Sequence, residues 1–469
     1  MLTIRLFKEQ LKSLFYYVSV RHLEQDKSAL NKWIKVRMSD EPVPRCRSDP
    51  LIMKLDTPEF HSIFTPELNT LSDIFKKYNY EIRVAGGAVR DILMGMTPKD
   101  LDFATTATPD QMTEMFSKEE VRMINANGAK HGTITPRINN TVNFEVTTLR
   151  IDVVTDGRHA EVKFTTDWLR DANRRDLTIN SMFLDLEGNV YDYFYGYDDL
   201  LKRKVVFVGH ASTRIQEDYL RILRYFRFYG RIANDPDNHD EETITAIKNN
   251  VSGLERISGE RIWSEWQKIL DGKYNAELMC NMIECGMAEY IGLPKNPDVE
   301  TFKTVCHRAR ANTLQVRPIT LICAMLRDQE EVMALHSRLK LAAYDRDLGL
   351  FIVQHREDKP CEKPLKPYQY LILNPKGKIP DSRGFVTELL KYKGAIDLLK
   401  ELGKWQVPRF PLNGNMLKPH ISQGKLIGPV MGALKKIWLD DDFKTSPENL
   451  IKHIPEILDD IKEKGKQVH

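Results

Sequence analysis

The stretch Val84–Thr105, VAGGAVRDILMGMTPKDLDFAT, decides the fold predicted for the first part of this chain. An apolar run ends at Gly86-Gly87, a helix-forming run follows, and LDFAT after it is apolar apart from Asp102. The pattern predicts a strand, a glycine turn, a helix that stops at Gly95, and a second strand. Strands and helices that follow one another in this way indicate a mixed α/β domain.

The glycine turn has a chemical interpretation as well as a conformational one. Gly86 and Gly87 lack a Cβ, so backbone N–H groups there can approach an anion closely, and the start of a helix favours negative charge. Arg90, one turn into the helix, would reach the same anion with a forked set of donors. The alternative is a turn whose glycines serve the backbone conformation alone.

Asp100 and Asp102 favour the chemical interpretation. Residues i and i+2 of a strand point to the same face, and two adjacent carboxylates repel each other unless a cation lies between them. After a phosphate cradle they predict a metal–triphosphate site, because Mg²⁺ takes one or two carboxylates together with phosphate oxygens. A two-metal arrangement would activate a 3′-hydroxyl nucleophile and stabilise the departing pyrophosphate. The alternative is a pair of solvated acids on an edge strand.

Glu145, in NFEVTTLR, is a further candidate for this site. It lies among apolar residues of a predicted strand, where an unpaired acid would be costly. Two interpretations stay open: a third carboxylate of the metal site, or an ion pair with Arg150 or another base.

The remaining pattern divides the chain into an α/β part and a helical part. Up to about residue 200 we predict a helix, a long strand, a mobile loop and a hairpin that turns at Glu187-Gly188, over 68–78, 140–154, 155–167 and 180–194. From about residue 212 helical periodicity recurs, with a proline-bearing boundary at 358–370. The fold class is an α/β N-terminal domain with a mixed sheet, followed by a mostly α-helical remainder.

The composition excludes several classes of protein. Of 469 residues, 42% are hydrophobic and 29% are charged, as in globular domains. No run is apolar enough for a membrane-spanning helix. The six cysteines show neither a C-x-x-C pair nor zinc-ligand spacing, which fits a reducing compartment. The net charge of +3 neither requires nor excludes a nucleic-acid partner.

The first residues, MLTIRLFKEQLKSLFYYVSVRH, indicate a targeting segment. They carry Arg5, Lys8, Lys12 and Arg21 against a single acid, and charges interrupt the apolar residues. This is typical of a mitochondrial presequence rather than a secretory signal. An ordinary amphipathic helix is the alternative. Met38 offers a second start, and a chain begun there would lack the presequence.

Four motifs, in order, carry a resemblance to a known family. GGAVRD with DLDFAT is similar to the first motif of the nucleotidyltransferase superfamily that contains tRNA CCA-adding enzymes and bacterial poly(A) polymerases. RRDLTINSM (174–182) resembles its second motif, EDYLRILRYFRF (217–228) its E-D-x-x-R motif, and LERISGERIWSEW (254–266) the helical motif after it. Weaker similarity continues to GKLIGPVMGALKKIW near the end. The chain resembles a class II tRNA nucleotidyltransferase of eukaryotic type.

The resemblance implies an activity, a nucleotidyltransferase head domain and a set of partners. The activity is sequential addition of C, C and A to the 3′ end of a tRNA, with CTP and ATP as donors and Mg²⁺ at Asp100 and Asp102. The sequence indicates no membrane and no obligate protein partner. Two rivals stay open: a poly(A) polymerase with the same catalytic domain, and a catalytically inactive RNA-binding relative. The intact carboxylates argue against the second.

Asp218 and Arg221 have a chemical interpretation that does not need the family. Three residues apart on a predicted helix, they would be surface neighbours, one offering only acceptors and the other only donors. Cytosine and adenine both present a donor amine beside a ring acceptor, which suits this pair. Uracil and guanine would instead place an acceptor opposite Asp218 and a donor opposite Arg221. This mismatch would cost about 1–3 kcal/mol per unsatisfied group. The protein would then serve as the template; a plain intrahelical ion pair is the alternative.

The other nucleotide-binding candidates follow from the motifs. Arg175 is predicted to contact the nucleotide, whereas Arg174 either does so or pairs with a local acid. Asp176 is predicted to cap a turn beside them. Arg224 and Arg227 continue the three-residue spacing of the E-D-x-x-R motif and are predicted as phosphate contacts or supports.

The resemblance also implies the organisation of the chain. The predicted parts are a presequence and linker, a catalytic head, a neck with the nucleotide-selecting motif, a helical body and a helical tRNA-binding tail, over 1–38, 39–205, 206–272, 273–357 and 358–469. In the predicted loop, Asp156, Arg158 and His159 match a mobile family segment that helps to switch from C to A. The predicted location is the mitochondrion, with cytoplasm and nucleus for a form that starts at Met38.

Basic residues outside the motifs are candidates for RNA phosphate contacts. They are Lys202, Arg203 and Lys204, and in the tail Lys418, Lys425, Lys435 and Lys436. Ordinary solvated faces are the alternative. Small residues near the tail lysines, at Gly424, Gly428 and Gly432, would allow close approach of another helix or of an RNA backbone.

Overall fold

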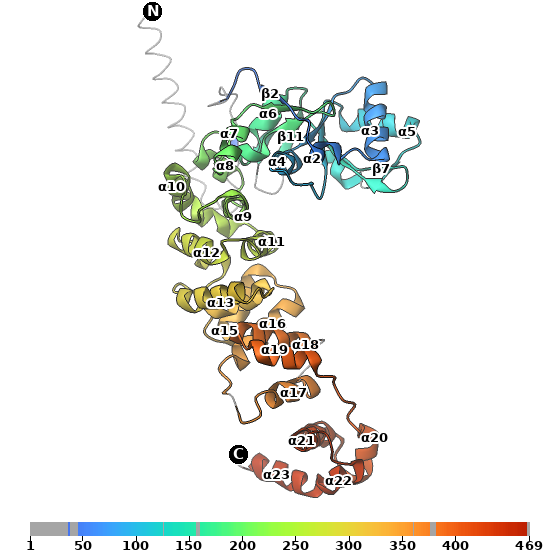
Figure 1. The fold of residues 1–469 in the computed structure, drawn as a ribbon, viewed down its shortest axis with the longest axis vertical. Coiled ribbons are helices and arrows are strands. Elements are labelled where there is room, and N and C mark those ends of the chain that lie inside the picture. The colour runs from blue at the N-terminus through green and yellow to red at the C-terminus, as the bar shows by residue number, and fades with distance from the viewer. Residues whose placement is uncertain are drawn as a thin grey trace, which may run out of the picture. The chain divides into compact units, whose positions relative to one another are not determined.

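The computed structural model describes residues 36–37, 46–124, 126–155, 160–359, 361–375 and 381–466 (Figure 1). Its contacts form two compact units: unit 1 comprises Met1–Arg221 with Asp240–Asn250, and unit 2 comprises Ile222–His239 with Val251–His469. The predicted presequence lies outside the described residues up to Lys35. The predicted boundaries between head, neck, body and tail stay predictions.

Unit 1 is built on a mixed sheet with the strand order β2-β13-β12-β3-β4-β9-β6. Its strands are β2 (Leu51–Lys54), β3 (Ile82–Ala85), β4 (Asp102–Thr105), β6 (Thr133–Ile134), β9 (Glu145–Thr148), β12 (Phe183–Leu184) and β13 (Asn189–Asp192). In this sheet β4 runs antiparallel to β3 and parallel to β9. The sheet therefore brings together segments that lie far apart in the sequence.

Two smaller sheets complete the strands of unit 1, with the orders β1-β10-β11 and β5-β7-β8. Their strands are β1 (Val36–Arg37), β5 (Arg122–Met123), β7 (Pro136–Ile138), β8 (Val142–Asn143), β10 (Arg150–Thr155) and β11 (Ala160–Phe164).

The helices of unit 1 are α2 (Pro58–His61), α3 (Pro66–Lys77), α4 (Gly87–Leu93), α5 (Pro109–Lys118), α6 (Trp168–Asn173), α7 (Gly196–Leu201), α8 (Ala211–Glu217) and α10 (Glu241–Asn250), with the 3₁₀ turns η1 (Ala126–His131) and η2 (Thr178–Asn180). Four of these helices, α2, α3, α5 and α6, start at a side-chain cap. At α5, Thr108 and Gln111 form a reciprocal capping box. At α6, the Asp167 carboxylate accepts from the N–H groups of Leu169 and Arg170.

The core of unit 1 fixes the strand ends that carry the predicted site. Phe103 of β4 packs edge to face on Phe144, with ring centroids 5.6 Å apart. Val84 and Val146, on the strands flanking β4, are fully buried. Asp102 and Glu145 are the first residues of β4 and β9, and both are exposed, whereas the residues that follow them in these strands are mostly buried.

Two of the predicted strand assignments differ from the structure. The predicted strand over 140–154 is divided into β8, β9 and β10, because buried Phe144 and Leu149 leave the ladder. The N–H groups of Phe144 and Leu149 bond instead to the carbonyls of Pro136 and Thr105. The predicted loop over 155–167 is wrong for residues 160–164, which form β11 antiparallel to β10. The predicted hairpin at Glu187-Gly188 is confirmed by β12 and β13.

Within the described residues of unit 2, helices are the regular secondary structure, and no strand is present. After Arg221 the chain continues α9 (Arg221–Ile232), and the further helices are α11 (Gly259–Leu270), α12 (Asn275–Glu284), α13 (Val299–Ala311), α14 (Pro318–Ile322), α15 (Gln329–Leu339), α16 (Ala343–His355), α17 (Lys366–Leu373), α18 (Ser382–Lys393), α19 (Ile396–Lys404), α20 (Gly414–Leu417), α21 (Ile427–Asp440), α22 (Pro447–Lys452) and α23 (Ile454–Lys466). Short 3₁₀ turns connect them: η3 (Val251–Arg256), η4 (Glu289–Ile291), η5 (Cys323–Met325), η6 (Lys418–His420) and η7 (Gly424–Leu426).

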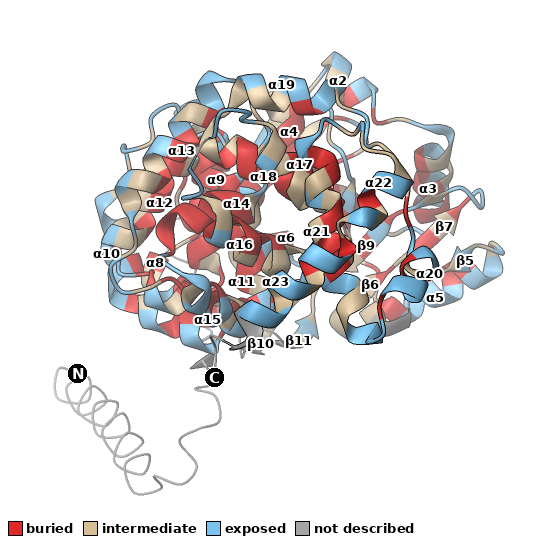
Figure 2. Ribbon diagram, turned by 90° about the horizontal axis from the view of Figure 1, so that it is seen from below, coloured by how far each residue is buried: buried red, intermediate tan, exposed pale blue. Residues whose placement is uncertain are grey.

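The helices of unit 2 pack through apolar faces. Figure 2 colours buried residues red along α14, α16 and α18. A separate cluster around Val430, Leu434 and Trp438 of α21 joins α21 to α17, α22 and α23. The predicted fold class, a mixed-sheet domain followed by a helical remainder, is confirmed.

Candidate functional site

The Gly86 turn joins β3 to α4 in a conformation that favours glycine. Gly86 has φ 68° and ψ −122°, and its N–H bonds to the carbonyl of Met182 at 3.1 Å. A Cβ at Gly86 would lie 3.0 Å from Nη1 of Arg175. The positive φ therefore favours glycine here, and a larger residue would also displace the Arg175 guanidinium.

Arg90 lies beneath this turn rather than in solvent. It is 2% exposed, its Nη2 and Nε bond to Oδ1 of Asp91 at 2.8 and 3.0 Å, and its Nη1 bonds to Oδ1 of Asn180 at 2.5 Å. The predicted direct reach of Arg90 to an anion does not follow from this geometry. Its guanidinium instead ties α4 to η2.

Asp102 and Glu145 lie side by side at the start of two parallel strands. The register of β4 and β9 pairs Asp102 with Glu145, and Asp100 lies two residues earlier, in a bend before β4. The predicted placement of both aspartates within one strand is thus wrong for Asp100. All three side chains are exposed to solvent. The structure nevertheless brings them into one region.

The electrostatics of Asp102 reflect this gathering. Desolvation by the surrounding protein raises the pKa of the Asp102 carboxyl, and the charges of Glu145 and Asp100 raise it further. The charge of Arg175 acts in the opposite direction. A carboxylate crowded by like charges is a site that a cation would relieve.

The donor set fits a hard divalent cation that shares its ligands with a substrate. Within the described residues, no three acidic, histidine or cysteine side chains form a group that could hold a metal unaided. A hard cation of this kind takes one or two carboxylates and completes its shell with water and phosphate oxygens. The exposed, mutually repelling carboxylates of Asp100 and Asp102 suit that division of ligands.

The open alternative for Glu145 was an ion pair with Arg150. The structure pairs Arg150 with other groups: its Nη1 donates to the carbonyl of His131, and its Nε lies 3.6 Å from Oδ1 of Asp152. Glu145 instead contributes to the field at Asp102. Its metal role stays a prediction.

Arg174 and Arg175 share one acid that the sequence reasoning missed. Nε of Arg174 bonds to Oδ1 of Asp171 at 2.8 Å, and Nη2 of Arg175 bonds to Oδ2 at 3.0 Å. The available signal was the spacing, because an acid three and four residues earlier on a helix faces both arginines. The prediction that Asp176 caps the following turn is wrong, because the N-cap of η2 is Leu177 and carries no side-chain cap. Oδ1 of Asp176 accepts from the N–H of Leu177 at 2.8 Å and from Nδ2 of Asn180 at 3.3 Å.

The prediction that Asp218 and Arg221 lie on one helix is wrong. Asp218 has extended backbone (φ −152°, ψ 105°) and ends α8, and α9 begins at Arg221. The Asp218 carboxylate accepts from the N–H of Leu220 at 3.1 Å, and its carbonyl accepts from the N–H of Arg221 at 2.9 Å. The helix breaks here because Asp218 bonds to the backbone that follows it.

The guanidinium of Arg221 is held on three sides. It donates to the carboxylate of Glu217, to the carbonyl of Arg214 at 3.0 Å and to the carbonyl of Arg174 at 2.9 Å. Glu217 is 3% exposed and also binds Arg214. Arg221 is therefore fixed before any ligand binds, and it joins the E-D-x-x-R segment to the end of α6.

Arg224 and Arg227 belong to the part of α9 within unit 2. Both guanidinium groups stack on Phe228, at 5.3 and 4.9 Å from the ring centroid. Arg227 also bonds to Glu265 of α11 at 3.0 Å. Arg227 thus has a structural role in helix packing, and nucleotide contacts of both residues stay predictions. The predicted loop residues Asp156, Arg158 and His159 lie outside the described residues.

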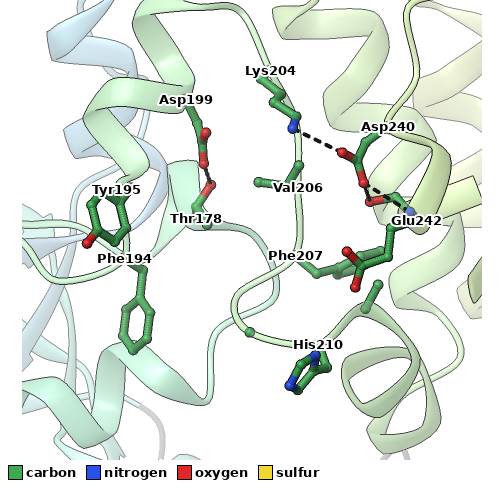
Figure 3. Close-up of a pocket in the computed structure, with 13 residues that line it drawn as sticks. Thr178, Phe194, Tyr195, Asp199, Lys204, Val206, Phe207, His210, Asp240 and Glu242 are labelled. Carbon is green, nitrogen blue, oxygen red and sulfur yellow. Dashed lines mark hydrogen bonds and ion pairs between the residues drawn. The ribbon is translucent and has the colours of Figure 1, made fainter. Parts of the chain in front are cut away.

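A cavity of about 200 Å³ in unit 1 lies apart from these residues (Figure 3). Thr178 donates to Asp199 at 2.6 Å on one side, and Lys204 pairs with Asp240 at 3.0 Å on the other. None of the residues predicted to bind metal or nucleotide lines it, although Lys204, a candidate RNA contact, does. Its walls hold both acids and bases, so the lining selects no ligand class.

Comparisons with known proteins agree with the geometry. Residues 82–206 match the family described as "Poly A polymerase head domain", and residues 239–295 match "Probable RNA and SrmB- binding site of polymerase A". The chain is 51% identical over 407 residues to the mitochondrial CCA tRNA nucleotidyltransferase 1 of Mus musculus, and likewise to that of Homo sapiens, spanning 86% of this chain and 93% of each relative. A CCA-adding enzyme of Geobacillus is 34% identical over 227 residues, 48% of this chain and 54% of that protein.

Solved structures share the fold. The CCA-adding enzyme of Bacillus stearothermophilus in complex with CTP superposes with a TM-score of 0.68 at 24% identity, covering 87% of this chain and 100% of that one. The Thermotoga maritima CCA-adding enzyme complexed with tRNA gives a TM-score of 0.61 at 19% identity, over 87% and 99% of the two chains. In the part of the chain that the structure describes, no helix is long and apolar enough to cross a membrane.

The ordered motifs, the mixed-sheet domain with its exposed carboxylates, and the 51% identity over most of both chains lead to one family. This chain belongs to the CCA tRNA nucleotidyltransferases.

Proposed function

We propose that this chain adds C, C and A in turn to the 3′ end of a tRNA, with CTP and ATP as nucleotide donors. The observation that carries the proposal is the register of β4 and β9, which sets Asp102 opposite Glu145 with Asp100 close by. The identity to the mouse and human mitochondrial enzymes supports the same activity.

The proposed metal is Mg²⁺, held by Asp100 and Asp102, with Glu145 as a candidate third carboxylate. Bound there, it would lower the pKa of the primer hydroxyl and neutralise charge on the triphosphate. The chain's own part is to hold these carboxylates close together and open to solvent. The nearby charge of Arg175 opposes the rise in the pKa of Asp102 that desolvation, Glu145 and Asp100 cause.

The proposed triphosphate site lies between the Gly86 turn and the two arginines of the second motif. Nη1 of Arg175 lies 3.0 Å from the position that a Cβ of Gly86 would occupy. Phosphate oxygens and guanidinium groups match in charge and in hydrogen-bond geometry. Gly87 and Arg174 complete the set, and Arg90 supports the turn from beneath.

The proposed base reader is the pair Asp218 and Arg221. Asp218 offers acceptor oxygens to an amine, and Arg221 offers donors to a ring nitrogen. Three donated bonds within the protein fix the Arg221 guanidinium. Among the described contacts, its Nε and one hydrogen of Nη2 are not used, so these donors are available to a base. A fixed reader cannot turn to suit uracil or guanine, which supports selection by the protein itself.

The test uses purified protein, Mg²⁺ and a tRNA that ends at its unpaired discriminator base. Each nucleoside triphosphate is supplied alone, then CTP with ATP, and product length is read at single-nucleotide resolution. We expect two additions with CTP alone and a stop at three with both. A long ladder with ATP alone would assign a poly(A) polymerase, the activity in the descriptions of the matched family models. No extension with tRNA bound would leave an RNA-binding protein.

The proposed location is the mitochondrion, as in the names of the mouse and human relatives. A form begun at Met38 would lack the basic N-terminal segment and would serve the cytoplasm and nucleus. N-terminal sequencing of the protein from separated compartments tests this. Recovery of only one N-terminus in all compartments would contradict it.

A further inference from the structure

One buried carboxylate lies under the second motif. Asp171 of α6 is 1% exposed. Its Oδ1 accepts from Nε of Arg174 at 2.8 Å and from the backbone N–H of Arg150 at 3.1 Å. Its Oδ2 accepts from Nε of Arg175 at 3.3 Å and from Nη2 at 3.0 Å. Four donors saturate the carboxylate, so its position is fixed by the fold around it.

The charge of Asp171 is stabilised by the arginines that surround it. Burial alone would raise the pKa of this carboxyl, but Arg174 and Arg175 outweigh burial and hold the pKa below its ordinary value. Three guanidinium groups, of Arg150, Arg174 and Arg175, surround the two carboxylates of Asp171 and Asp152. The charge of Asp176 also acts on Arg175, so three guanidinium groups lie among three carboxylates in this cluster.

The bonds from Asp171 also set which nitrogen atoms face outward. Arg174 is held through Nε, and Arg175 through Nε and Nη2. Arg175 is further fixed by the ring of Phe183, 4.8 Å from its Cζ. Its Nη1, which also lies 3.4 Å from the carbonyl of Asn180, approaches the Gly86 turn. The carboxylate thus fixes Nε of Arg174 and both Nε and Nη2 of Arg175, and so sets the orientation of both guanidinium groups.

We propose that Asp171 is a positioning residue, which holds Arg174 and Arg175 in the orientation that receives the triphosphate of the incoming nucleotide. This rests on the proposed function. The carboxylate does not touch the nucleotide; it acts through the two arginines. It serves CTP and ATP alike because both carry the same triphosphate.

The main test is Asp171→Asn. Asparagine keeps the size of the side chain, but it removes the charge and turns an N–H₂ group towards the guanidinium donors. We expect KM for CTP and for ATP to rise by roughly 10- to 100-fold, as for the loss of charged hydrogen bonds. The affinity for tRNA should change less than about threefold. Unchanged KM values in a folded variant would overturn the proposal.

Asp167→Asn is the matched control on the same helix. Asp167 caps α6 through the N–H groups of Leu169 and Arg170, at 2.9 and 3.3 Å, and does not bond to Arg174 or Arg175. It should lower the melting temperature slightly and leave KM for both nucleotides unchanged. If it raised KM as much as Asp171→Asn, the effect would come from α6 stability, and the positioning role would be overturned.

A double-mutant cycle separates positioning from structure. In the Arg174→Gln/Arg175→Gln background, Asp171→Asn should add less than about a twofold change in KM, because the residues through which it acts are gone. Additive effects would overturn the proposal. Calorimetric titration of CTP without tRNA measures the same cycle by affinity, so it remains decisive even if the wild-type protein fails to extend tRNA.

Asp171→Asn alone leaves buried guanidinium groups without their counter-ion, and such changes can prevent folding. The triple variant with Arg174→Gln and Arg175→Gln removes those groups as well. If the triple variant folds where the single variant does not, the role of the Asp171 carboxylate is to hold the two arginines, as proposed. If it is as unstable as the single variant, Asp171 serves the backbone at Arg150 instead, and the proposal is overturned.

Discussion

Asp102 shows how a side chain with a proposed catalytic role acts against the stability of the fold that carries it. The protein partly desolvates it, and Glu145 and Asp100 repel it, so its pKa is raised. For a carboxyl with a raised pKa in the folded state, the contribution to stability is fully present below the ordinary pKa of 3.8. It is lost as pH rises through the raised value. At neutral pH the ionised group is therefore held at a cost, which a bound cation would relieve.

Asp102→Asn should abolish turnover and stabilise the protein at neutral pH. We expect kcat to fall by at least roughly 10²–10³-fold, as when an electrostatic catalytic group is removed. The melting temperature at pH 7.5 should rise, because the repelled charge is gone, and the gain should shrink as pH falls towards the ordinary carboxyl range. Calorimetric melting over a pH series, with tRNA affinity measured in parallel, checks this. Asp110→Asn, on an exposed acid of α5, is the control. A lower melting temperature would make Asp102 structural.

The same residue predicts a metal effect. Mg²⁺ should raise the melting temperature of the wild-type protein in the presence of CTP by mass action, and it should do so less for Asp102→Asn. The wild-type effect should weaken as pH falls through the raised pKa of Asp102, because protonation removes a ligand. Equal shifts in both proteins would place the cation elsewhere.

Among the elements, those with local signals could be predicted from sequence. The turn at Gly86 and the hairpin at Gly188 could be predicted because glycine lies between apolar runs there. Both glycines adopt positive φ. The sequence does not predict β11, because Ala160–Phe164 has too little alternation of apolar and polar residues. This segment is a strand because it pairs with β10. The pairing of Asp102 with Glu145 is a long-range register, which no local pattern encodes.

Side-chain partners were less predictable than elements. Arg90 was expected at an anion, but its neighbour Asp91 is a competing acceptor, and Asn180 arrives from a distant turn. Asp171 could have been found from its spacing to Arg174 and Arg175 once α6 was recognised. Asp218 was placed on a helix by periodicity, whereas its own carboxylate ends that helix by accepting from Leu220.

The break between α8 and α9 carries the prediction on base selection. Because Arg221 is fixed by three bonds in unit 1, Arg221→Gln should lose the charge and the fixed fork together. We expect the preference for CTP over UTP in the first addition to fall by roughly 10- to 100-fold, which corresponds to one or two unsatisfied groups. Competition assays with both nucleotides measure it.

The control for base selection is Arg231→Gln, at the exposed end of α9. It should change neither nucleotide preference nor tRNA affinity by more than about twofold. If Arg221→Gln weakened tRNA binding while the preference for CTP stayed intact, Arg221 would be an RNA contact, and base selection by the protein would lose its support.

At the scale of the whole chain, similarity to known proteins extends beyond the two segments that the family models match. The family models cover 82–206 and 239–295, and the 51% identity extends over most of the remaining chain. The last part has its own apolar cluster, in which Lys435 is partly buried and donates to the carbonyl of Leu373 at 2.6 Å. Gly432 lies against Asn374, where a Cβ would meet Nδ2 at 2.9 Å. Lys435 and Gly432 thus serve packing.

Lys418 and Lys425 remain exposed, and Gly424 and Gly428 have open space around them. If these lysines contact tRNA phosphates, each releases counter-ions on binding. The double variant Lys418→Gln/Lys425→Gln should therefore weaken tRNA binding and flatten the dependence of log K on log salt concentration by about 1.4–1.8 in slope. KM for CTP should stay the same, because the proposed triphosphate site lies in unit 1. Lys118→Gln, which removes an exposed ion pair with Glu114, is the control. A slope equal to that of the wild-type protein would make the two lysines ordinary solvated residues and move the RNA surface to other basic groups, with Lys202 and Arg203 the next to be changed.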